Sequence, residues 1–319
     1  MIGTDLHYAI QLLQAEQLVS IPTETVYGLA GNALSDKAVA QIFVVKNRPR
    51  FDPLIVHTDS LERLKTFVTH FPKNAEILAE AFLPGPLTLL LPKKGEIPDL
   101  VTAGSPLVAL RIPAHPLTLD LLQRLDFPLA APSANPFGYI SPTTARHVEQ
   151  QLGYKIPYIL DGGACAVGLE STIVGFEGEK VIIYRKGGIA IEAIKPLVGR
   201  VEVKPHSTSN PQAPGMLQSH YAPRVPLVLG NLEELFEKYK DKKLGIICFQ
   251  KPPYFRIPLS PYSPISLSPS GNFAEAARNL FAAMRYLDSL DLDLIIAELL
   301  PEESLGSAIN DRLCRAAAQ

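Results

Sequence analysis

The sequence predicts an α/β (α+β) protein of two domains, the first built on a twisted mixed sheet and the second a smaller parallel α/β domain. A length of 319 residues is typical of two domains that each bury a core. Up to residue 190, short strands and helices follow one another without regular βαβ repetition, which indicates a mixed sheet. After residue 226, strands and helices alternate, which indicates a parallel one.

Helical periodicity and short apolar runs locate the elements of the first domain. The first helix has apolar residues at Leu6, Ile10 and Leu13 and can be capped by Thr4 or Asp5. Further helices are expected over 36–45, 61–68, 75–82 and 143–151. Strands are expected over 18–21, 54–57, 87–91, 107–112, 129–131, 156–160, 173–176 and 181–184.

The composition changes near residue 201 and marks a linker. Eleven prolines fall between residues 201 and 269, and a segment so rich in proline and polar residues does not build a core. We therefore expect a first domain over 1–200, a linker over 201–225 and a second domain over 226–319. In the second domain we expect strands over 227–229, 244–249 and 294–299, and helices over 232–239, 273–287 and 307–317.

A basic loop is the strongest sign of a binding site. In KNRPRFDPLIVH, residues Lys46, Arg48 and Arg50 alternate just before a strand. A solvated basic surface is one interpretation. The other is a site for a polyanion, because Pro49 and Pro53 stiffen the loop and leave little ordering entropy to be lost on binding. We favour a phosphate-bearing substrate here.

Two further loops carry hydroxyl and amide groups at strand ends, where sites often lie. Ser133 and Asn135 would point the same way if the backbone is extended, although Asn135 could instead serve a turn. Ser141 either belongs to this site or caps the helix over 143–151. Arg111 lies in the apolar run VALRIP and must have a partner, which is either a structural salt bridge or a substrate.

Global properties exclude several classes of protein. The net charge of −2 counts against a dedicated nucleic-acid binder. Cys165, Cys248 and Cys314 lack CxxC spacing, so neither a disulfide framework nor a zinc site is indicated, and a reducing cytoplasm is the expected setting. No run approaches the ~18 apolar residues of a membrane span, so we expect no membrane contact. The Walker and GxGxxG motifs are missing too.

Five ordered motifs resemble those of a known family. They are KNRP, DPLIVH, APSANPFGYISPT, DGGACAVGLESTIV and PGMLQSHYAP. Together they resemble the Sua5 branch of the YrdC/Sua5 family, the threonylcarbamoyl-AMP synthases. The resemblance implies a YrdC-like catalytic domain and a Rossmann-like C-terminal domain. It also implies a nucleotidyltransferase that makes L-threonylcarbamoyladenylate and pyrophosphate from L-threonine, bicarbonate or CO2, and ATP, for N6-threonylcarbamoylation of adenosine 37 in tRNA.

The resemblance also implies roles for individual residues. It implies that Mg²⁺ is held mainly by the ATP phosphates, without a protein metal site, and that the linker closes over the nucleotide. Asp52 stands where the family commonly has asparagine, and its carboxylate would repel phosphates unless a Mg²⁺ lies between them or the side chain is turned away. The implied catalytic residues are Lys46, Arg48, Ser133 and Asn135; the ATP-binding residues are Arg48, Asp52, Ser133, Ser141, Arg185 and Tyr221; the threonine-binding residues are Thr25, His57, Arg111 and Ser171.

Two other functions remain open from the residues. A non-catalytic RNA-binding or translation-associated protein would use the same basic loop on a phosphate backbone. A carbamoyl-transfer domain of the hydrogenase-maturation kind would be expected beside acylphosphatase and zinc-finger modules, which this sequence lacks. For a synthase, the expected partners are its substrates and the tRNA threonylcarbamoyltransferase that receives the product, with at most weak contact to tRNA.

Overall fold

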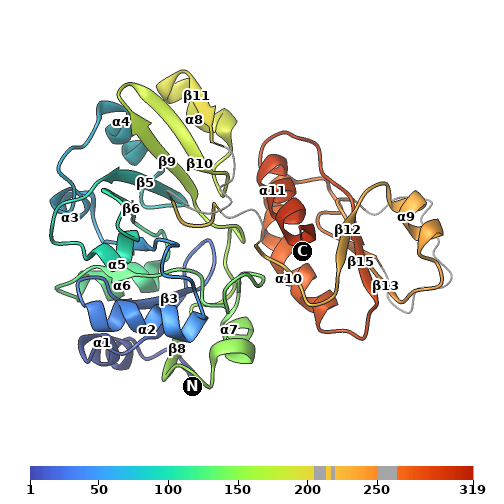
Figure 1. Cartoon of the computed structure of the whole chain (residues 1–319), viewed down its shortest axis with the longest axis horizontal. Coiled ribbons are helices and arrows are strands. Elements are labelled where there is room, and N and C mark those ends of the chain that lie inside the picture. The colour runs from blue at the N-terminus through green and yellow to red at the C-terminus, as the bar shows by residue number, and fades with distance from the viewer. Residues whose placement is uncertain (205–212, 217–219, 251–263, 319) are drawn as a thin grey trace. The chain divides into compact units, whose positions relative to one another are not determined.

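The computed structural model describes residues 1–204, 213–216, 220–250 and 264–318, which form two compact units (Figure 1). The first unit comprises Met1–Phe137 and Ser141–Leu217, and the second comprises Gly138–Ile140 and Gln218–Gln319. Residues 205–212 and 217–219 of the expected linker lie outside the described residues.

The first unit is built on a mixed sheet, as predicted. Among the described residues its strand order is β1-β8-β2-β3-β7-β4-β6-β5-β9-β10-β11, and parallel and antiparallel pairs occur together. The strands are β1 (Ile2–Gly3), β2 (Val19–Ile21), β3 (Gly28–Asn32), β4 (Ile55–His57), β5 (Leu87–Pro92), β6 (Leu107–Arg111), β7 (Leu129–Ala130), β8 (Tyr158–Leu160), β9 (Thr172–Glu177), β10 (Lys180–Arg185) and β11 (Val201–Val203).

Several helices of the first unit begin at side chains that accept hydrogen bonds from their free N–H groups. The Asp5 carboxylate accepts a hydrogen bond from the Tyr8 amide, and Ser35 and Thr144 cap α2 and α7 in the same way. Ser141 is therefore not the cap of α7. The helices are α1 (Leu6–Gln14), α2 (Asp36–Lys46), α3 (Leu61–Thr66), α4 (Lys73–Phe82), α5 (Asp99–Thr102), α6 (Pro116–Gln123), α7 (Ala145–Leu152) and α8 (Ile191–Val198).

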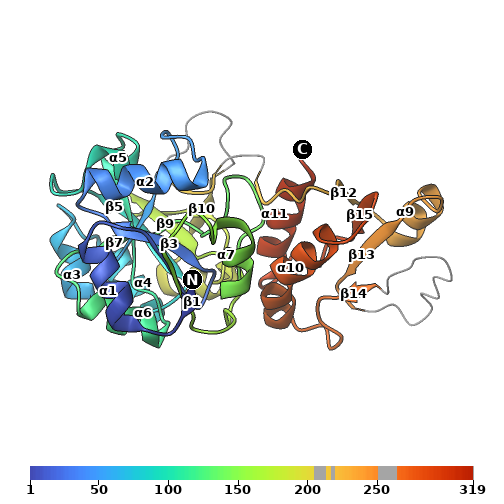
Figure 2. The ribbon, with the colours of Figure 1, turned by 90° about the horizontal axis from the view of Figure 1, so that it is seen from below.

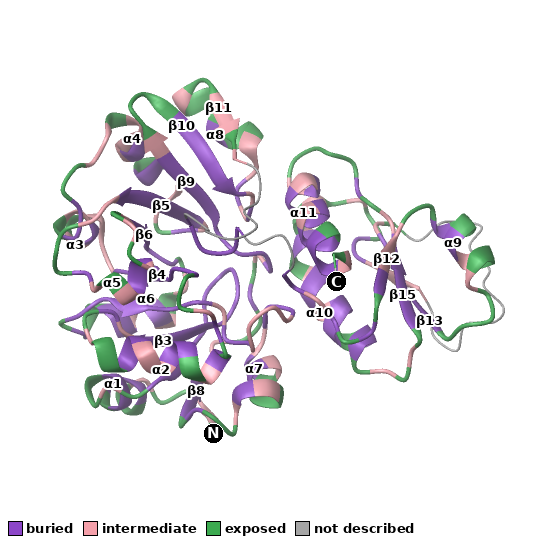
Figure 3. Cartoon of the chain, viewed as in Figure 1, coloured by how far each residue is buried: buried purple, intermediate pink, exposed green. Residues whose placement is uncertain are grey.

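Packing explains where the sheet is covered. Alternate residues of the strands enter different clusters, because side chains of a strand point to opposite faces in turn. Leu89, Leu110 and Val174 belong to a large core that also contains residues of α2, α4 and α7. Their neighbours Leu90, Ala109 and Ile173 face a smaller cluster, together with Ala213 and Met216 of the linker region. The strands are mostly buried, and much of the outer helix surface is exposed (Figure 3).

The second unit contains the parallel sheet that was predicted. Its strands follow the order β12-β15-β13-β14, and every described pair is parallel. Helices α10 and α11 lie on one side of the sheet and α9 on the other (Figures 1 and 2). The elements are β12 (Leu227–Leu229), α9 (Leu232–Lys238), β13 (Leu244–Cys248), β14 (Ile265–Ser266), α10 (Phe273–Asp288), β15 (Leu294–Ala297) and α11 (Gly306–Ala317). None of the described helices combines the length and the apolar character that crossing a membrane would require.

Candidate functional site

The predicted threonine-binding residues of the first unit lie at one edge of its sheet, where β4 and β6 end and β5 and β9 begin. Strands β4 and β6 run parallel with His57 paired to Arg111 at their ends. Strand β5 runs antiparallel to β6 and begins beside that end, and β9 begins beside β5. Side chains of a strand point to opposite faces in turn, so His57 lies on the same face as Ile55, and Arg111 on the same face as Ala109. Residues Ala213 and Met216 pack on this face.

Arg185 reaches the same edge through an irregularity in β10. The pairing of β10 with β9 shifts between Ile183 and Arg185, as at a β-bulge, so that Arg185 pairs with Ile173. Its guanidinium donates to the Ser171 hydroxyl (3.0 Å), the Ser171 carbonyl (3.1 Å) and the carbonyl of Pro214 (3.3 Å). The Ser171 hydroxyl also bonds to that of Thr88 (2.7 Å). Arg185 therefore joins the predicted threonine residue Ser171 to the linker region.

Lys46 is buried rather than displayed on a loop. It ends α2, and only 1% of the residue is exposed. Its ammonium donates to the carbonyl oxygens of Ser133 and Asn135, at 2.5 Å each. Burial lowers the pKa of Lys46 well below its ordinary value, and the nearby Arg48 charge lowers it further. Lys46 of the motif KNRP therefore contacts Ser133 and Asn135 of the motif APSANPFGYISPT directly.

Arg48 and Asp52 form a buried ion pair. Nη2 of Arg48 lies 2.9 Å from Oδ2 of Asp52, and the side chains are 5% and 0% exposed. Burial raises the pKa of Asp52, whereas the charges of Arg48, Lys46 and Arg185 act to lower it. The structure pairs the Asp52 carboxylate with Arg48, a partner that the sequence analysis did not assign to it. Arg50, by contrast, is exposed, so the basic loop is solvated only in part.

Arg111 forms a structural salt bridge with Glu24, which is one of the two interpretations that the sequence left open. It forms an ion pair of 2.6 Å with Glu24 and donates to the hydroxyl of Thr25 at 2.9 Å and the carbonyl of Gly85 at 3.1 Å. Glu24 also accepts a hydrogen bond from the Ala114 amide. The sequence interpretation gave Glu24 no role. The signal was available, because an acid between two threonines near a strand end is a natural partner for a buried arginine.

A second carboxylate also escaped notice. The Ser141 hydroxyl donates to Glu170 at 2.5 Å, and both residues are buried. The backbone of residues 187–188 runs close to Glu170, since the Gly188 amide donates to the Glu170 carbonyl at 2.9 Å. A side chain at Gly187 would overlap that carbonyl oxygen. Glycine is therefore required here to bring the end of β10 against the Ser141 and Glu170 pair.

His57 is neutral in this setting, which gives a testable pH dependence. Burial, and then the charge of Arg111, lower its pKa to about 3. In the unfolded chain His57 has an ordinary histidine pKa of ~6.5. Between a pH of about 3 and this value, the unfolded chain binds more protons than the folded protein, so the free energy of unfolding falls as the pH falls. We expect the unfolding free energy of His57→Gln to decline less steeply from pH 6.5 to 4, by roughly 1 kcal/mol per pH unit. Urea denaturation measures this, with exposed His70→Gln as control; identical slopes for His57→Gln and the parent protein would contradict it.

Tyr221 belongs to the second unit and is buried there. Its ring stacks on Phe281 with centroids 5.5 Å apart and contacts His220 edge-on at 4.2 Å. The guanidinium carbons of Arg312 and Arg315 lie 5.1 and 4.7 Å from the ring centroid. Such cation–π contacts are strongest when desolvated. The aromatic residue of the linker motif is thus fixed by its own unit, and its contact with nucleotide stays a prediction.

The donor set suits a magnesium ion that arrives with phosphates. Mg²⁺ keeps several waters and typically takes one or two carboxylates in addition to substrate oxygens. Glu24 and Asp52 are already paired with arginines. Glu170 is a further buried carboxylate, and it accepts a hydrogen bond from the Ser141 hydroxyl.

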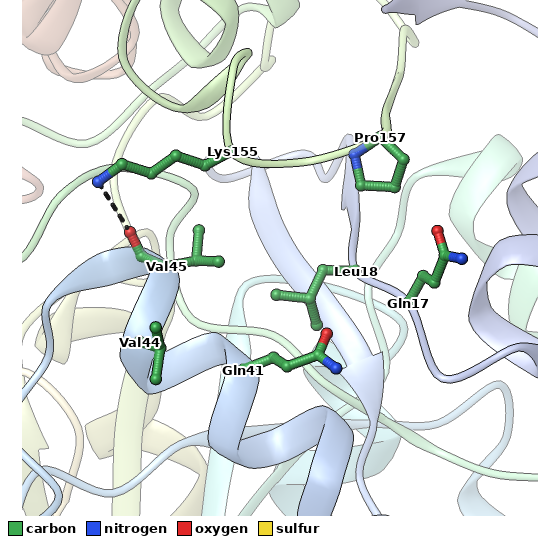
Figure 4. A pocket seen from close by; sticks show the side chains of 7 residues that line it. All are labelled: Gln17, Leu18, Gln41, Val44, Val45, Lys155 and Pro157. Carbon is green, nitrogen blue, oxygen red and sulfur yellow. Dashed lines mark hydrogen bonds between the residues drawn. The ribbon is translucent and has the colours of Figure 1, made fainter.

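A surface depression of about 260 Å³ lies apart from these residues (Figure 4). The Lys155 ammonium reaches across it to the Val45 carbonyl at 3.5 Å. None of the predicted site residues is among its lining residues, which are Gln17, Leu18, Gln41, Val44, Val45, Lys155 and Pro157.

The chain is similar to known proteins over nearly its whole length. The profile of the Sua5_yciO_yrdC family, described as "Telomere recombination", matches residues 11–187, and that of "Threonylcarbamoyl-AMP synthase, C-terminal domain" matches residues 189–318. Proteins named threonylcarbamoyl-AMP synthase from Pyrococcus abyssi and Bacillus subtilis are each 38% identical to the chain. The alignments cover 98% and 97% of the chain and 93% and 92% of those proteins.

A solved structure extends the agreement to the whole fold. The crystal structure of P. abyssi Sua5 complexed with L-threonine matches the chain with a TM-score of 0.92 and 37% sequence identity. The match covers 99% of this chain and 97% of that one. Nothing in these comparisons favours a non-catalytic RNA-binding protein.

Proposed function

The chain belongs to the Sua5 branch of the YrdC/Sua5 family, the threonylcarbamoyl-AMP synthases, and from this we propose that the sheet edge of its first unit is where the adenylate forms. The chain has the function of a threonylcarbamoyl-AMP synthase, an enzyme of tRNA modification. We assign it more finely to the nucleotidyltransferases that use L-threonine, bicarbonate or CO2, and ATP. Its product would pass to the tRNA threonylcarbamoyltransferase.

The observation that carries the site assignment is the burial of four cationic side chains in the first unit. Lys46, Arg48, Arg111 and Arg185 are 1%, 8%, 4% and 7% exposed. Burying charged groups is costly unless anions accompany them. Three buried carboxylates of the first unit offset part of this positive charge. They belong to Glu24, Asp52 and Glu170. Anionic substrates would complete the compensation.

The reaction gathers negative charge, so the proposed roles are positioning and electrostatic stabilisation. The threonine nitrogen forms a bond to carbon and gives a carbamate: with CO2 the nitrogen loses a proton, and with bicarbonate a carbon–oxygen bond breaks and water leaves. A carbamate oxygen then bonds to the α-phosphorus of ATP, and the bond from that phosphorus to the pyrophosphate oxygen breaks. We assign Arg111, Thr25, His57 and Ser171 to threonine, with Arg111 facing its carboxylate.

The phosphate side of the site falls to the residues around Lys46. The ammonium of Lys46 holds two carbonyl groups, so its contribution includes fixing the shape of the 133–135 loop as well as its charge. Arg48, Arg185, Ser133, Ser141 and Asn135 are assigned to the phosphates and the carbamate. Mg²⁺ carried on the phosphates would neutralise part of their charge. The linker with Tyr221 would keep water from the carbamate, which otherwise loses CO2 readily.

Pyrophosphate release tests the function directly. We expect the purified protein to release pyrophosphate only when L-threonine, bicarbonate and Mg·ATP are all supplied, and to form a product with the mass of the adenylate. Retention of tRNA on a filter should be weak. Strong tRNA retention without pyrophosphate release would instead support the RNA-binding alternative.

The ion pair of Asp52 leads to a further prediction. Asp52→Asn removes a negative charge beside Arg48 and leaves the guanidinium charge for the phosphates, at a separation of 2.9 Å in the parent protein. We expect the KM for ATP to fall several-fold while the KM for threonine is unchanged. Steady-state kinetics in both substrates measure this, with the exposed Asp120→Asn as control. A higher KM for ATP would show that Asp52 assists nucleotide binding instead.

A further inference from the structure

Three residues of the second unit come from the middle of the proposed ATP site. Gly138–Ile140 belong to the second unit, whereas Phe137 and Ser141 on either side belong to the first. In the sequence, these three residues lie between Asn135 and Ser141. Both Asn135 and Ser141 are completely buried. Whatever holds Gly138–Ile140 therefore acts on the loop that carries the predicted catalytic residue Asn135 and the predicted ATP-binding residue Ser141.

The second unit holds this segment through both main chain and side chain. The Tyr139 hydroxyl donates to the carboxylate of Asp288, and the Arg285 guanidinium lies 5.1 Å from the centroid of the Tyr139 ring. Arg285 also donates to the carbonyl of Ile140. The carbonyl of Gly138 accepts a hydrogen bond from the Ala222 amide at 2.8 Å. Each of the three residues is thus bound individually.

Asp288 is placed for this contact at a cost to its own helix. It is the last residue of α10, where a negative charge opposes the helix dipole. The residue is 2% exposed, and its carboxylate also accepts hydrogen bonds from the Arg224 and Val225 amides at 2.6 and 2.9 Å. Arg224 Nε lies 3.1 Å away as well. The carboxylate therefore ties the Tyr139 hydroxyl and the chain that follows the linker motif to one point.

The first unit holds the two ends of the loop. The Phe137 amide donates to the Lys46 carbonyl at 2.8 Å, and the Pro142 carbonyl accepts from the Tyr27 amide at 2.9 Å. Between these bonds, Gly138 adopts a positive φ of 80°, which lets the chain turn outward. The middle of the loop depends on the second unit.

We infer that Tyr139 and Asp288 are positioning residues, through which the C-terminal unit sets the loop that presents Asn135 and Ser141 to the nucleotide. This inference rests on the proposed function and assigns a task to the C-terminal unit within it. It concerns the nucleotide half of the site, because none of the predicted threonine residues lies on this loop.

Tyr139→Phe is the most conservative test, because it removes one hydroxyl and keeps the ring against Arg285. A lost hydrogen bond to a charged group corresponds to about a tenfold change in affinity. We expect the KM for ATP to rise about tenfold, with the KM for threonine unchanged, and faster amide hydrogen exchange in a peptide spanning residues 136–144. Tyr286→Phe is the matched control. Tyr286 lies on α10, the helix that carries Asp288, but it is 53% exposed.

A double-mutant cycle completes the test. Asp288→Asn should shift the KM for ATP in the same direction, and the double variant should be no worse than the more affected single variant, because both act through one contact. If the parent protein turns over and Tyr139→Phe leaves its KM for ATP and its exchange unchanged, the inference fails while the proposed function stands. If the parent protein releases no pyrophosphate, the proposed function itself fails.

Discussion

Lys46→Ala is expected to lower the rate of adenylate formation by about 10²- to 10³-fold, the usual loss when one preorganised donor to developing charge is removed. The ammonium is buried and bonds the carbonyls of Ser133 and Asn135. Its removal takes away a charge and also releases the loop that bears them. Initial rates of pyrophosphate release measure the loss. Lys46→Met keeps most of the side-chain volume and should be impaired to a similar extent.

Arg50→Ala is the matched control for Lys46→Ala. It removes a cation from the same loop four residues away, at an exposed position. We expect its rate to stay within about twofold of the parent protein, because exposed charges are strongly screened. Equal losses for both variants would mean that only the overall charge of the loop matters. An active Lys46→Ala protein would remove Lys46 from the site.

Glu24→Ala is expected to destabilise the first unit by roughly 3–5 kcal/mol, since it leaves the guanidinium of Arg111 buried without its carboxylate. The Ala114 amide would also lose its acceptor. Chemical denaturation monitored by circular dichroism measures the change. Asp120→Asn breaks the exposed pair of Asp120 and Arg124 and should cost less than about 1 kcal/mol.

The double variant Glu24→Leu with Arg111→Met separates charge from packing. Replacing both members of a buried ion pair by apolar side chains is often nearly neutral for stability. We therefore expect this variant to be more stable than Glu24→Ala, yet to have lost threonine-dependent turnover. A double variant less stable than Glu24→Ala would contradict the ion-pair explanation.

The general architecture could be predicted because most elements carry local signals. The parallel sheet of the second unit follows from alternating strands and helices, and α1 begins at its predicted cap Asp5. Strand β3 was not predicted, because its sequence GLAGN has little of the β-branched or aromatic character that marks strands. Helix α8 contains Pro196 and was not predicted. Such elements depend on tertiary packing rather than on local preference.

The site could be predicted in its residues but not in its pairing. The sequence showed that Arg111 needs a partner, but which residue would reach it depends on the distance between segments far apart in the chain. Glu24 is brought to Arg111 only when the sheet forms. Lys46 was placed in a loop because two prolines follow it, and the structure shows that α2 continues through Lys46, with Asn47 in a left-handed conformation after it. Helix ends are poorly determined by sequence.

The central claim is that buried cations of the first unit gather the anionic reactants. A crystal structure with Mg·ATP or the adenylate bound tests this claim most directly. We predict phosphate oxygens within hydrogen-bonding distance of Arg48 or Arg185 and of the Ser133 to Ser141 loop, with the threonine carboxylate at Arg111. Phosphates bound elsewhere, with Lys46 and Arg48 still engaged only with Asp52 and the loop carbonyls, would contradict the account.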